Sequence, residues 1–182
     1  LEITAWQKVA TPPSLAPEQI HVWRFNLAGA EFQPAKVLEA WLSADERRRA
    51  ARYLHAAAAA RFRLARSLVR WVLAGYTGLP LKSLVFAYGL QGKPTLAGLG
   101  GGLEFNLSHC GGLALLAVAR ELPLGVDLER VRPRAQLLGI ARRVFSAEVC
   151  RELEALAPEV RLRRFYHYWT ALEARVKAEV EA

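Results

Sequence analysis

Two apolar segments in the middle of the chain, joined by a glycine-containing turn, constrain its fold most strongly. The runs LEFNLS (103–108) and GLALLAVA (112–119) have the composition of strands, and HCGG (109–112) predicts a tight turn between them. A connection this short can join only antiparallel strands, because parallel strands need a long crossover. The sequence therefore predicts an antiparallel hairpin around which the rest of the chain must pack.

Helical and strand-like patterns lie on both sides of this hairpin without regular alternation. Ser43 and Glu46 have the spacing of a capping box, and the Ala- and Arg-rich run after them predicts one helix, or two meeting near residues 56–60, up to the breakers Gly78 and Pro80. Further strands are predicted at 20–27 and 124–131, and further helices from Ser146 and over 159–182. This order favours an α+β fold over a doubly wound sheet.

The net charge of +8 is unevenly distributed. Residues 47–70 contain eight arginines and no acidic residue, which indicates a polyanionic partner: phosphate groups, an acidic protein surface or nucleic acid. The alternative is a solvated helix face. No run has the length of a membrane span and the first residues do not resemble a signal peptide, so a cytoplasmic protein is expected. The chain begins at Leu1 and contains no methionine, which suggests trimmed ends.

Two carboxylates stand two residues apart in the apolar run LGVDLERV (124–131). On a strand, Asp127 and Glu129 share one face while Val126 and Leu128 point to the core. Because two adjacent carboxylates repel each other, a divalent cation between them is one interpretation, and oxygen ligands suit magnesium. The other is a solvated strand end, with Glu129 paired to a neighbouring arginine.

A third carboxylate and a lysine lie on the predicted last helix. Glu173 and Lys177 are four residues apart, so they are neighbours on one helix face below Trp169. An exposed ion pair explains this spacing equally well. The two sets are nevertheless complementary, since the three carboxylates suit a metal ion while Lys177, Lys93 and the arginine run suit phosphates.

Ser108 and His109 end the first hairpin strand. Adjacent strand residues point to opposite faces, so this pair is poorly placed to act as nucleophile and base and fits anion contacts better. In the sequence GKP (92–94), glycine permits close backbone approach and proline stiffens the loop that carries Lys93. A plain surface turn is the alternative there.

Taken in order, GKP (92–94), FNLSH (105–109), GVDLE (125–129) and WTALEARVKA (169–178) resemble the motifs of the Sfp-type 4′-phosphopantetheinyl transferases, over residues from about 41 to 178. The resemblance implies an enzyme that moves the phosphopantetheine arm of coenzyme A to a serine of an acyl or peptidyl carrier protein in fatty-acid, polyketide or peptide synthesis and releases adenosine 3′,5′-bisphosphate. It also implies two similar α+β lobes, 1–115 and 116–182, with the active site between them. Because the chain stops at Ala182, the second lobe is expected to be incomplete.

The resemblance also assigns roles to residues. The expected metal is magnesium, or manganese in its place, with Asp127, Glu129 and Glu173 as ligands. The expected catalytic residues are Glu173, Lys177 and Asp127. For the base, the reaction chemistry favours Glu173, directly or through a metal-bound water, and leaves Asp127 or Glu129 acting through water as alternatives. The expected coenzyme A contacts are Arg48, Arg61, Gly92, Lys93, Pro94, Ser108, His109, Asp127 and Lys177. The sequence departs from the family at Leu172, where a lysine is common.

The expected partners are coenzyme A and an acidic carrier protein, with the chain acting as a monomer and without nucleic acid or membrane. Two alternatives stay open. One is a basic nucleic-acid-binding module that uses the arginines of 47–70, and it leaves the three carboxylates without a role. The other is a catalytically silent domain that binds an acidic protein partner. Magnesium-dependent binding of coenzyme A distinguishes the three hypotheses.

Overall fold

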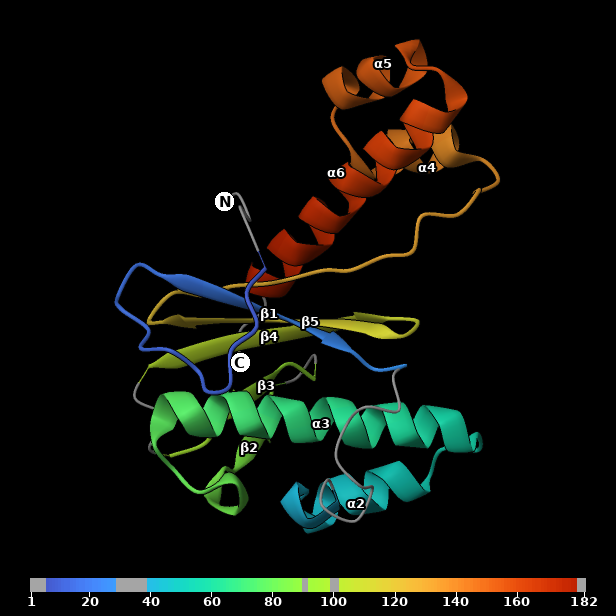
Figure 1. Ribbon diagram of the computed structural model, residues 1–182. Coiled ribbons are helices and arrows are strands. Elements are labelled where there is room, and N and C mark those ends of the chain that lie inside the picture. Colours follow the sequence, from blue (N-terminus) through green and yellow to red (C-terminus); the bar gives the residue numbers. More distant parts are fainter. Residues whose placement is uncertain (1–5, 29–38, 90–91, 99–101, 180–182) are drawn as a thin grey trace.

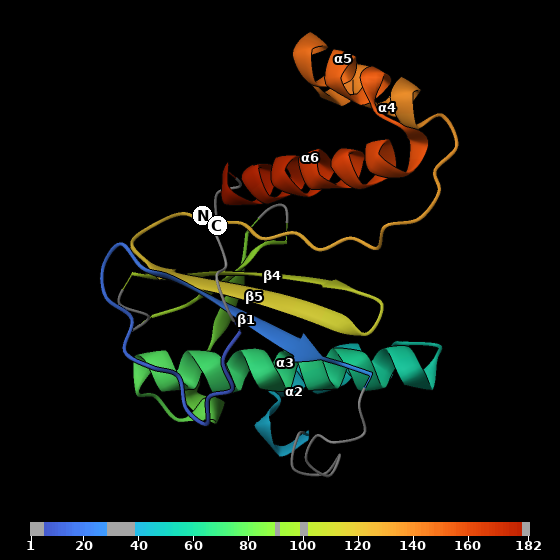
Figure 2. The ribbon, with the colours of Figure 1, turned by 45° about the horizontal axis from the view of Figure 1, so that its top comes forward.

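The computed structural model describes residues 6–28, 39–89, 92–98 and 102–179. The elements in chain order are β1 (Ile20–Asn26), α2 (Ala44–Ala51), α3 (Ala56–Thr77), the 3-10 turn η1 (Leu81–Ser83), β2 (Phe86–Tyr88), β3 (Pro94–Leu96), β4 (Leu103–Cys110), β5 (Leu113–Arg120), α4 (Leu137–Val144), α5 (Ala147–Ala155) and α6 (Pro158–Glu179). Figures 1 and 2 show three layers. Helices α2 and α3 form the first, the sheet of β1, β4 and β5 forms the second, and the segment after β5 together with helix α6 forms the third. The predicted α+β class is confirmed.

The predicted hairpin supplies two of the three strands of the main sheet. β4 and β5 pair in antiparallel register through Gly111 and Gly112, and β1 adds to the other side of β5, so the order is β1-β5-β4. Side chains alternate along β5: Leu116 and Val118 face the main core against α3, whereas Ala117 and Ala119 face the opposite side. The sheet therefore has a large apolar face under α3 and a face with small side chains that lets another segment approach closely.

The helical region 43–77 consists of two helices, α2 and α3. This is one of the two alternatives predicted for it. Ser43 caps α2 through a full capping box, in which its hydroxyl accepts from the Glu46 amide and the Glu46 carboxylate accepts from the Ser43 amide. α3 runs from Ala56 to Thr77 and is capped by Gly78, whose φ of 70° is the left-handed conformation that glycine adopts without a steric penalty. α3 covers the sheet and α2 packs on its outer side (Figure 1).

The prediction of a strand over 124–131 is wrong. Residues 121–135, which we call the strap, contain neither helix nor strand. The strap crosses the small-residue face of the sheet, between the sheet and α6 (Figures 1 and 2), and Leu124 and Val126 pack there with Ala117 and Ala119. A segment lying over a sheet face shows the same apolar alternation as a strand, but it cannot join the backbone ladder because it does not lie beside an edge.

The C-terminal helices pack around a second, smaller core. Ala141, Cys150, Leu153, Phe165 and Tyr166 bury their side chains between α4, α5 and α6. The predicted helix after Ser146 is confirmed as α5, with the Ser146 hydroxyl accepting from the Val149 amide. α4 was not predicted, and residues 180–182 of the predicted last helix lie outside the described residues. None of the helices within the described ranges is long and apolar enough to cross a membrane.

Candidate functional site

A buried ion cluster anchors α2 to α3. The Glu46 carboxylate accepts hydrogen bonds from Arg66 Nε and Arg70 Nε, both at 2.7 Å, and all three side chains are buried. Arg70 also donates to the carbonyls of Leu81 and Leu84, at 2.8 and 3.0 Å. A buried charge is tolerated only when it is paired and hydrogen-bonded, and this cluster meets both conditions. It therefore holds α2, with its arginines, in a defined place on α3.

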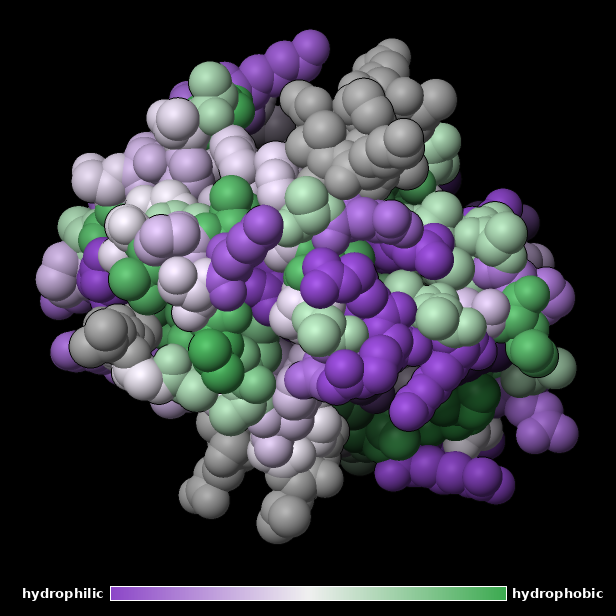
Figure 3. All heavy atoms as spheres, turned by 90° about the horizontal axis from the view of Figure 1, so that it is seen from below, coloured by the Kyte–Doolittle hydropathy of each residue, from purple (hydrophilic) through white to green (hydrophobic). Residues whose placement is uncertain are grey.

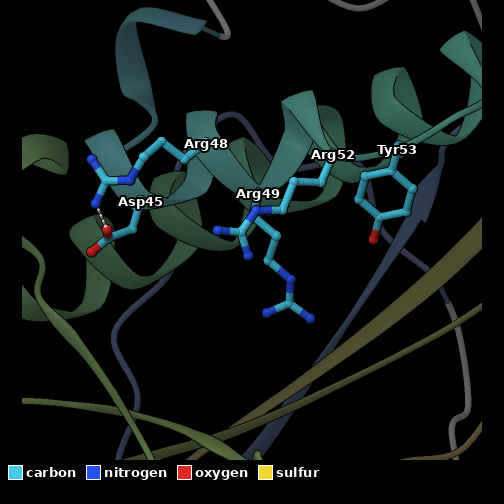
Figure 4. Close-up of a pocket in the computed structure, with 5 residues that line it drawn as sticks. All are labelled: Asp45, Arg48, Arg49, Arg52 and Tyr53. Atoms are coloured by element: carbon cyan, nitrogen blue, oxygen red, sulfur yellow. Dashed lines mark hydrogen bonds and ion pairs between the residues drawn. The ribbon is translucent and has the colours of Figure 1, made fainter.

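The arginines of α2 and of the turn after it are exposed on one face of the molecule. Figure 3 views this face and shows hydrophilic side chains gathered across it. A hollow of about 580 Å³ lies beside Asp45, Arg48, Arg49, Arg52 and Tyr53. In Figure 4, Arg48 is turned to Asp45, with which it forms an ion pair, while Arg49, Arg52 and Tyr53 extend together. Arg48, the predicted contact, is thus already paired, whereas its neighbour Arg49 is directed along the hollow.

A second hollow, of about 410 Å³, shares Arg49 and Tyr53 with the first. It contains four of the predicted coenzyme A contacts, namely Arg61, Gly92, Pro94 and His109. Its walls also include Arg66 and the rings of Phe62 and Tyr88. Lys93 lies between two lining residues, but its own side chain is buried and lies outside the lining of both hollows. Guanidinium groups beside aromatic rings suit a ligand that combines phosphates with a flat ring.

Ser108 and His109 point to opposite sides of the sheet, as their adjacency predicted. His109 is exposed and lines the second hollow, whereas Ser108 is buried under the strap. The Ser108 hydroxyl accepts from the Leu128 amide at 3.1 Å and donates to Asp127 Oδ1 at 3.0 Å. The hydroxyl of Ser108 is therefore engaged by the protein itself, while His109 faces the space available to a ligand.

Asp127 and Lys177 form the second part of the site. Lys177 Nζ lies 2.5 Å from Asp127 Oδ1 and also contacts the Val126 carbonyl, at 3.3 Å, and the Ser108 hydroxyl, at 3.4 Å. The Asp127 side chain is only 7% exposed. Its other oxygen, Oδ2, is buried and accepts no hydrogen bond from the described residues. A buried carboxylate oxygen without a partner is costly, so this atom is a candidate ligand for a cation.

The three predicted metal ligands are not assembled in the structure. Glu129 is exposed on the strap and Glu173 is half-buried on α6, one turn before Lys177. Within the described part of the chain, no three His, Cys, Asp or Glu side chains lie close enough together to hold a metal ion. Magnesium commonly takes only one or two protein carboxylates and completes its shell with water and substrate phosphates. Asp127, with its unpartnered Oδ2, fits such an ion.

Gly125 permits the close approach of α6 that brings Lys177 to Asp127. A Cβ atom at this position would stand 1.9 Å from the Ala174 carbonyl oxygen and 2.7 Å from the Ala178 amide nitrogen. Both are backbone atoms of a helix, which cannot move aside separately. Glycine is therefore required at this crossing of the strap and α6.

We expect Gly125→Ala to separate α6 from the strap, with a loss of about 1–3 kcal/mol from overpacking and a loss of the Lys177–Asp127 contact. Melting curves and the chemical shifts of the Asp127 and Lys177 side chains measure both effects. The matched control is Gly139→Ala on α4, where the nearest atom is an ordinary 3.7 Å away and alanine favours the helix. Equal melting temperatures for the two variants would contradict the prediction.

Comparisons with known proteins cover the segments that form this site. The sequence model of the 4′-phosphopantetheinyl transferase superfamily matches residues 123–180, which contain most of the strap and all of α6. The chain is 38% identical over 171 residues to the 4′-phosphopantetheinyl transferase HetI of Nostoc sp., covering 92% of this chain and 72% of HetI. The chain belongs to the 4′-phosphopantetheinyl transferase superfamily. The predicted family and enzyme class are thereby confirmed.

Two further relatives of this superfamily match over shorter spans. AcpT of Salmonella typhimurium is 43% identical over 98 residues, which is 54% of this chain and 50% of AcpT. The 4′-phosphopantetheinyl transferase of Bacillus subtilis is 32% identical over 136 residues, which is 75% of this chain and 59% of that protein. The chain thus spans between half and about three quarters of the curated phosphopantetheinyl transferases that it matches.

Four residues of this site were not among the individual contacts predicted from the sequence, although two of them belong to the arginine run 47–70. Arg49 and Arg66 line the hollows, Asn106 holds the strap, and Gly125 admits α6. For Arg66 the available signal was its spacing of four from Arg70, which places the two guanidinium groups on one face of the helix among apolar neighbours. Gly125 was part of a quoted motif, yet the need for glycine there depends on a helix that lies fifty residues later in the sequence.

Proposed function

We propose that this chain transfers the 4′-phosphopantetheine arm of coenzyme A to a serine of an acyl or peptidyl carrier protein in a magnesium-dependent reaction. The observation that supports this most is that two adjacent residues at the end of β4, Ser108 and His109, contact two different parts of the site. His109 lines a hollow walled by arginines and aromatic rings, and Ser108 contacts the Asp127–Lys177 pair. A nucleotide that carries several phosphates suits a hollow walled by arginines together with a lysine near the end of the same strand.

In this proposal the hollows hold the nucleotide part of coenzyme A. Arg49 and Arg61 neutralise its 3′-phosphate, and the rings of Phe62 and Tyr53 contact the base. Arg48 joins them only by leaving Asp45, with which it now pairs. The exposed His109 and the backbone at Gly92 and Pro94 border the path from these hollows to the diphosphate.

The chemical step requires charge neutralisation and one proton transfer. The carrier serine oxygen forms a bond to the phosphorus of the pantetheine phosphate, and the bond from that phosphorus to the bridging oxygen breaks, releasing adenosine 3′,5′-bisphosphate. Lys177 donates to the leaving phosphate, and Glu173, one helical turn away, accepts the serine proton. Asp127 would hold a magnesium ion, which supplies charge neutralisation at the diphosphate when bound. Glu129 and Glu173 would join it only after a rearrangement, because the three carboxylates do not form a metal-binding group among the described residues.

The partner in this proposal is an acidic carrier protein, since the chain carries a net charge of +8. The division into two similar lobes, 1–115 and 116–182, stays a prediction. Residue 115 lies within β5, so this boundary would divide a strand of the sheet.

The test is incubation of the protein with coenzyme A, magnesium and a panel of apo-carrier proteins, followed by mass spectrometry of the carriers. We expect a mass increase of one phosphopantetheine on at least one carrier. Coenzyme A alone should bind at low micromolar strength, about −8 kcal/mol, and more weakly as salt rises, because several basic groups meet phosphates. Absence of coenzyme A binding and no competition by adenosine 3′,5′-bisphosphate would refute the proposal. Binding to DNA or RNA instead would favour the nucleic-acid alternative.

A further inference from the structure

The strap is attached to the sheet by side chains instead of a backbone ladder. Asn106 Oδ1 accepts from the Val126 amide at 2.9 Å, and Ser108 Oγ accepts from the Leu128 amide at 3.1 Å. Both acceptors are buried. Asn106 and Ser108 are two residues apart on one face of β4. The two backbone amides that donate to them, those of Val126 and Leu128, are also two residues apart. The spacing of the acceptors on β4 thus matches the spacing of the donors on the strap.

Asp127 lies between the two attached amides. Its neighbours on each side, Val126 and Leu128, are held by Asn106 and Ser108, and its own Oδ1 accepts from the Ser108 hydroxyl at 3.0 Å. A slip of the strap by one residue would break both amide contacts and turn the Asp127 carboxylate away from Lys177, because alternate residues point in different directions. The register of the strap therefore decides where this carboxylate points.

We propose that Asn106 and Ser108 form a clasp that sets the register of the strap and thereby aims Asp127 at Lys177. Asn106 is then a positioning residue for the transfer reaction, and the Ser108 hydroxyl acts through Asp127 instead of through coenzyme A. The structural part of this proposal stands on the hydrogen bonds alone, and its catalytic part rests on the function proposed above.

The chemistry of the two acceptors explains why these residue types suit the clasp. An asparagine or serine side chain has an oxygen that reaches a backbone amide on a neighbouring segment, whereas alanine has none. Loss of either oxygen leaves a buried amide without a partner, which is unfavourable. The small side chains of Ala117 and Ala119 on the adjacent strand let the strap come close enough for these contacts.

The first test needs only the wild-type protein. Amide hydrogen exchange measured by NMR should show protection of Val126 and Leu128, although neither belongs to a helix or strand, while the exposed Arg130 in the same strap exchanges fast. Exchange of all three amides at the unprotected rate would overturn the clasp.

The second test compares variants that remove one acceptor each. Asn106→Ala should raise the exchange rate of the Val126 amide at least about tenfold and affect Leu128 less, and Ser108→Ala should show the reverse order. Asn106→Asp keeps an oxygen at the same place and should restore much of the protection. The matched control is Asn26→Ala, which removes a similar bond, from the Ala28 amide to Asn26 Oδ1 at 3.0 Å, on another strand of the same sheet. It should leave the strap amides unchanged.

The third test separates positioning from cofactor binding. In a carrier-loading assay, Asn106→Ala and Ser108→Ala should lower kcat about tenfold or more while the KM for coenzyme A changes less than about twofold. A rise in KM with kcat preserved would make Ser108 a cofactor contact and overturn the proposal for its hydroxyl. Unchanged kcat in both variants, with the amides released, would overturn the catalytic part.

The outcomes distinguish this proposal from the proposed function. If the wild type loads no carrier protein, the proposed function fails, and the exchange pattern alone decides whether the clasp exists. If Asn106→Ala does not fold, the wild-type exchange pattern and the Ser108→Ala and Asn106→Asp variants decide it. Uniform release of amides throughout the sheet in every variant would indicate general destabilisation and would contradict a local clasp.

Discussion

Asp127→Asn is expected to abolish carrier loading, with kcat lowered by at least about a thousandfold. The change keeps the shape of the side chain but removes the charge that faces Lys177 at 2.5 Å and the buried oxygen that accepts no hydrogen bond from the described residues. The fold should persist, because the neutral amide can still accept from the Ser108 hydroxyl. Melting curves and the loading assay, performed on the same preparation, measure the two effects separately.

The companion variants test the other two predicted ligands. Glu129→Gln and Glu173→Gln should also lose transfer if the three carboxylates share one ion in the loaded enzyme. With magnesium and coenzyme A present, the wild type should gain about 2.7 kcal/mol of stability at a hundredfold excess over the dissociation constant, and each variant should gain less. Glu154→Gln is the matched control, since Glu154 is an exposed carboxylate paired to Arg142 on the C-terminal helices. Wild-type loading by all three variants would refute the mechanism.

Glu46→Ala is expected to destabilise the protein by about 3–5 kcal/mol, the largest stability loss that we predict. The change leaves the guanidinium groups of Arg66 and Arg70 buried without their shared carboxylate, and it removes half of the capping box of α2. Chemical denaturation measures the loss. The control is Asp45→Ala, which removes the adjacent, exposed carboxylate and should cost about 1 kcal/mol or less.

The same cluster predicts a dependence of stability on pH. Burial raises the pKa of the Glu46 carboxyl, but the charge of Arg66, the Ser43 amide and the hydrogen bonds from Arg70 and Arg66 outweigh burial and lower this pKa below its ordinary value of 4.5. Because the folded pKa is lowered, the stability that Glu46 contributes is present above about pH 4.5 and is lost as the pH falls through the folded pKa. Glu46→Gln should flatten this part of the stability curve. An unchanged acid dependence in that variant would contradict the prediction.

The opposite environments of Asp127 and Glu129 show where the sequence pattern misled. Their spacing of two predicted one shared face of a strand, yet the side chain of Asp127 is only 7% exposed whereas Glu129 is exposed. Alternation of apolar and charged residues indicates only that one side of a segment is buried. It does not say whether the backbone hydrogen bonds go to another strand or, as here, to the side chains of Asn106 and Ser108.

Local interactions account for what the sequence determined by itself. The capping box at Ser43, the glycine turn of the hairpin, the cap at Ser146 and the opposite directions of Ser108 and His109 depend on residues at most a few positions apart, so they are visible in the order of residues. The ordered motifs likewise indicated the family, and with it the enzyme class, before any geometry was known.

Contacts between distant segments decided the rest. Only the packing of α2 on α3 and of α3 against the sheet placed Arg49 together with Arg61 and His109 around one hollow, and only the crossing of α6 over Gly125 placed Lys177 on Asp127. These arrangements bring together residues far apart in the sequence, and each depends on the shapes of whole elements. Periodicity and spacing report which side of a segment is buried, whereas the identity of the segment that buries it follows from the packing of the complete chain.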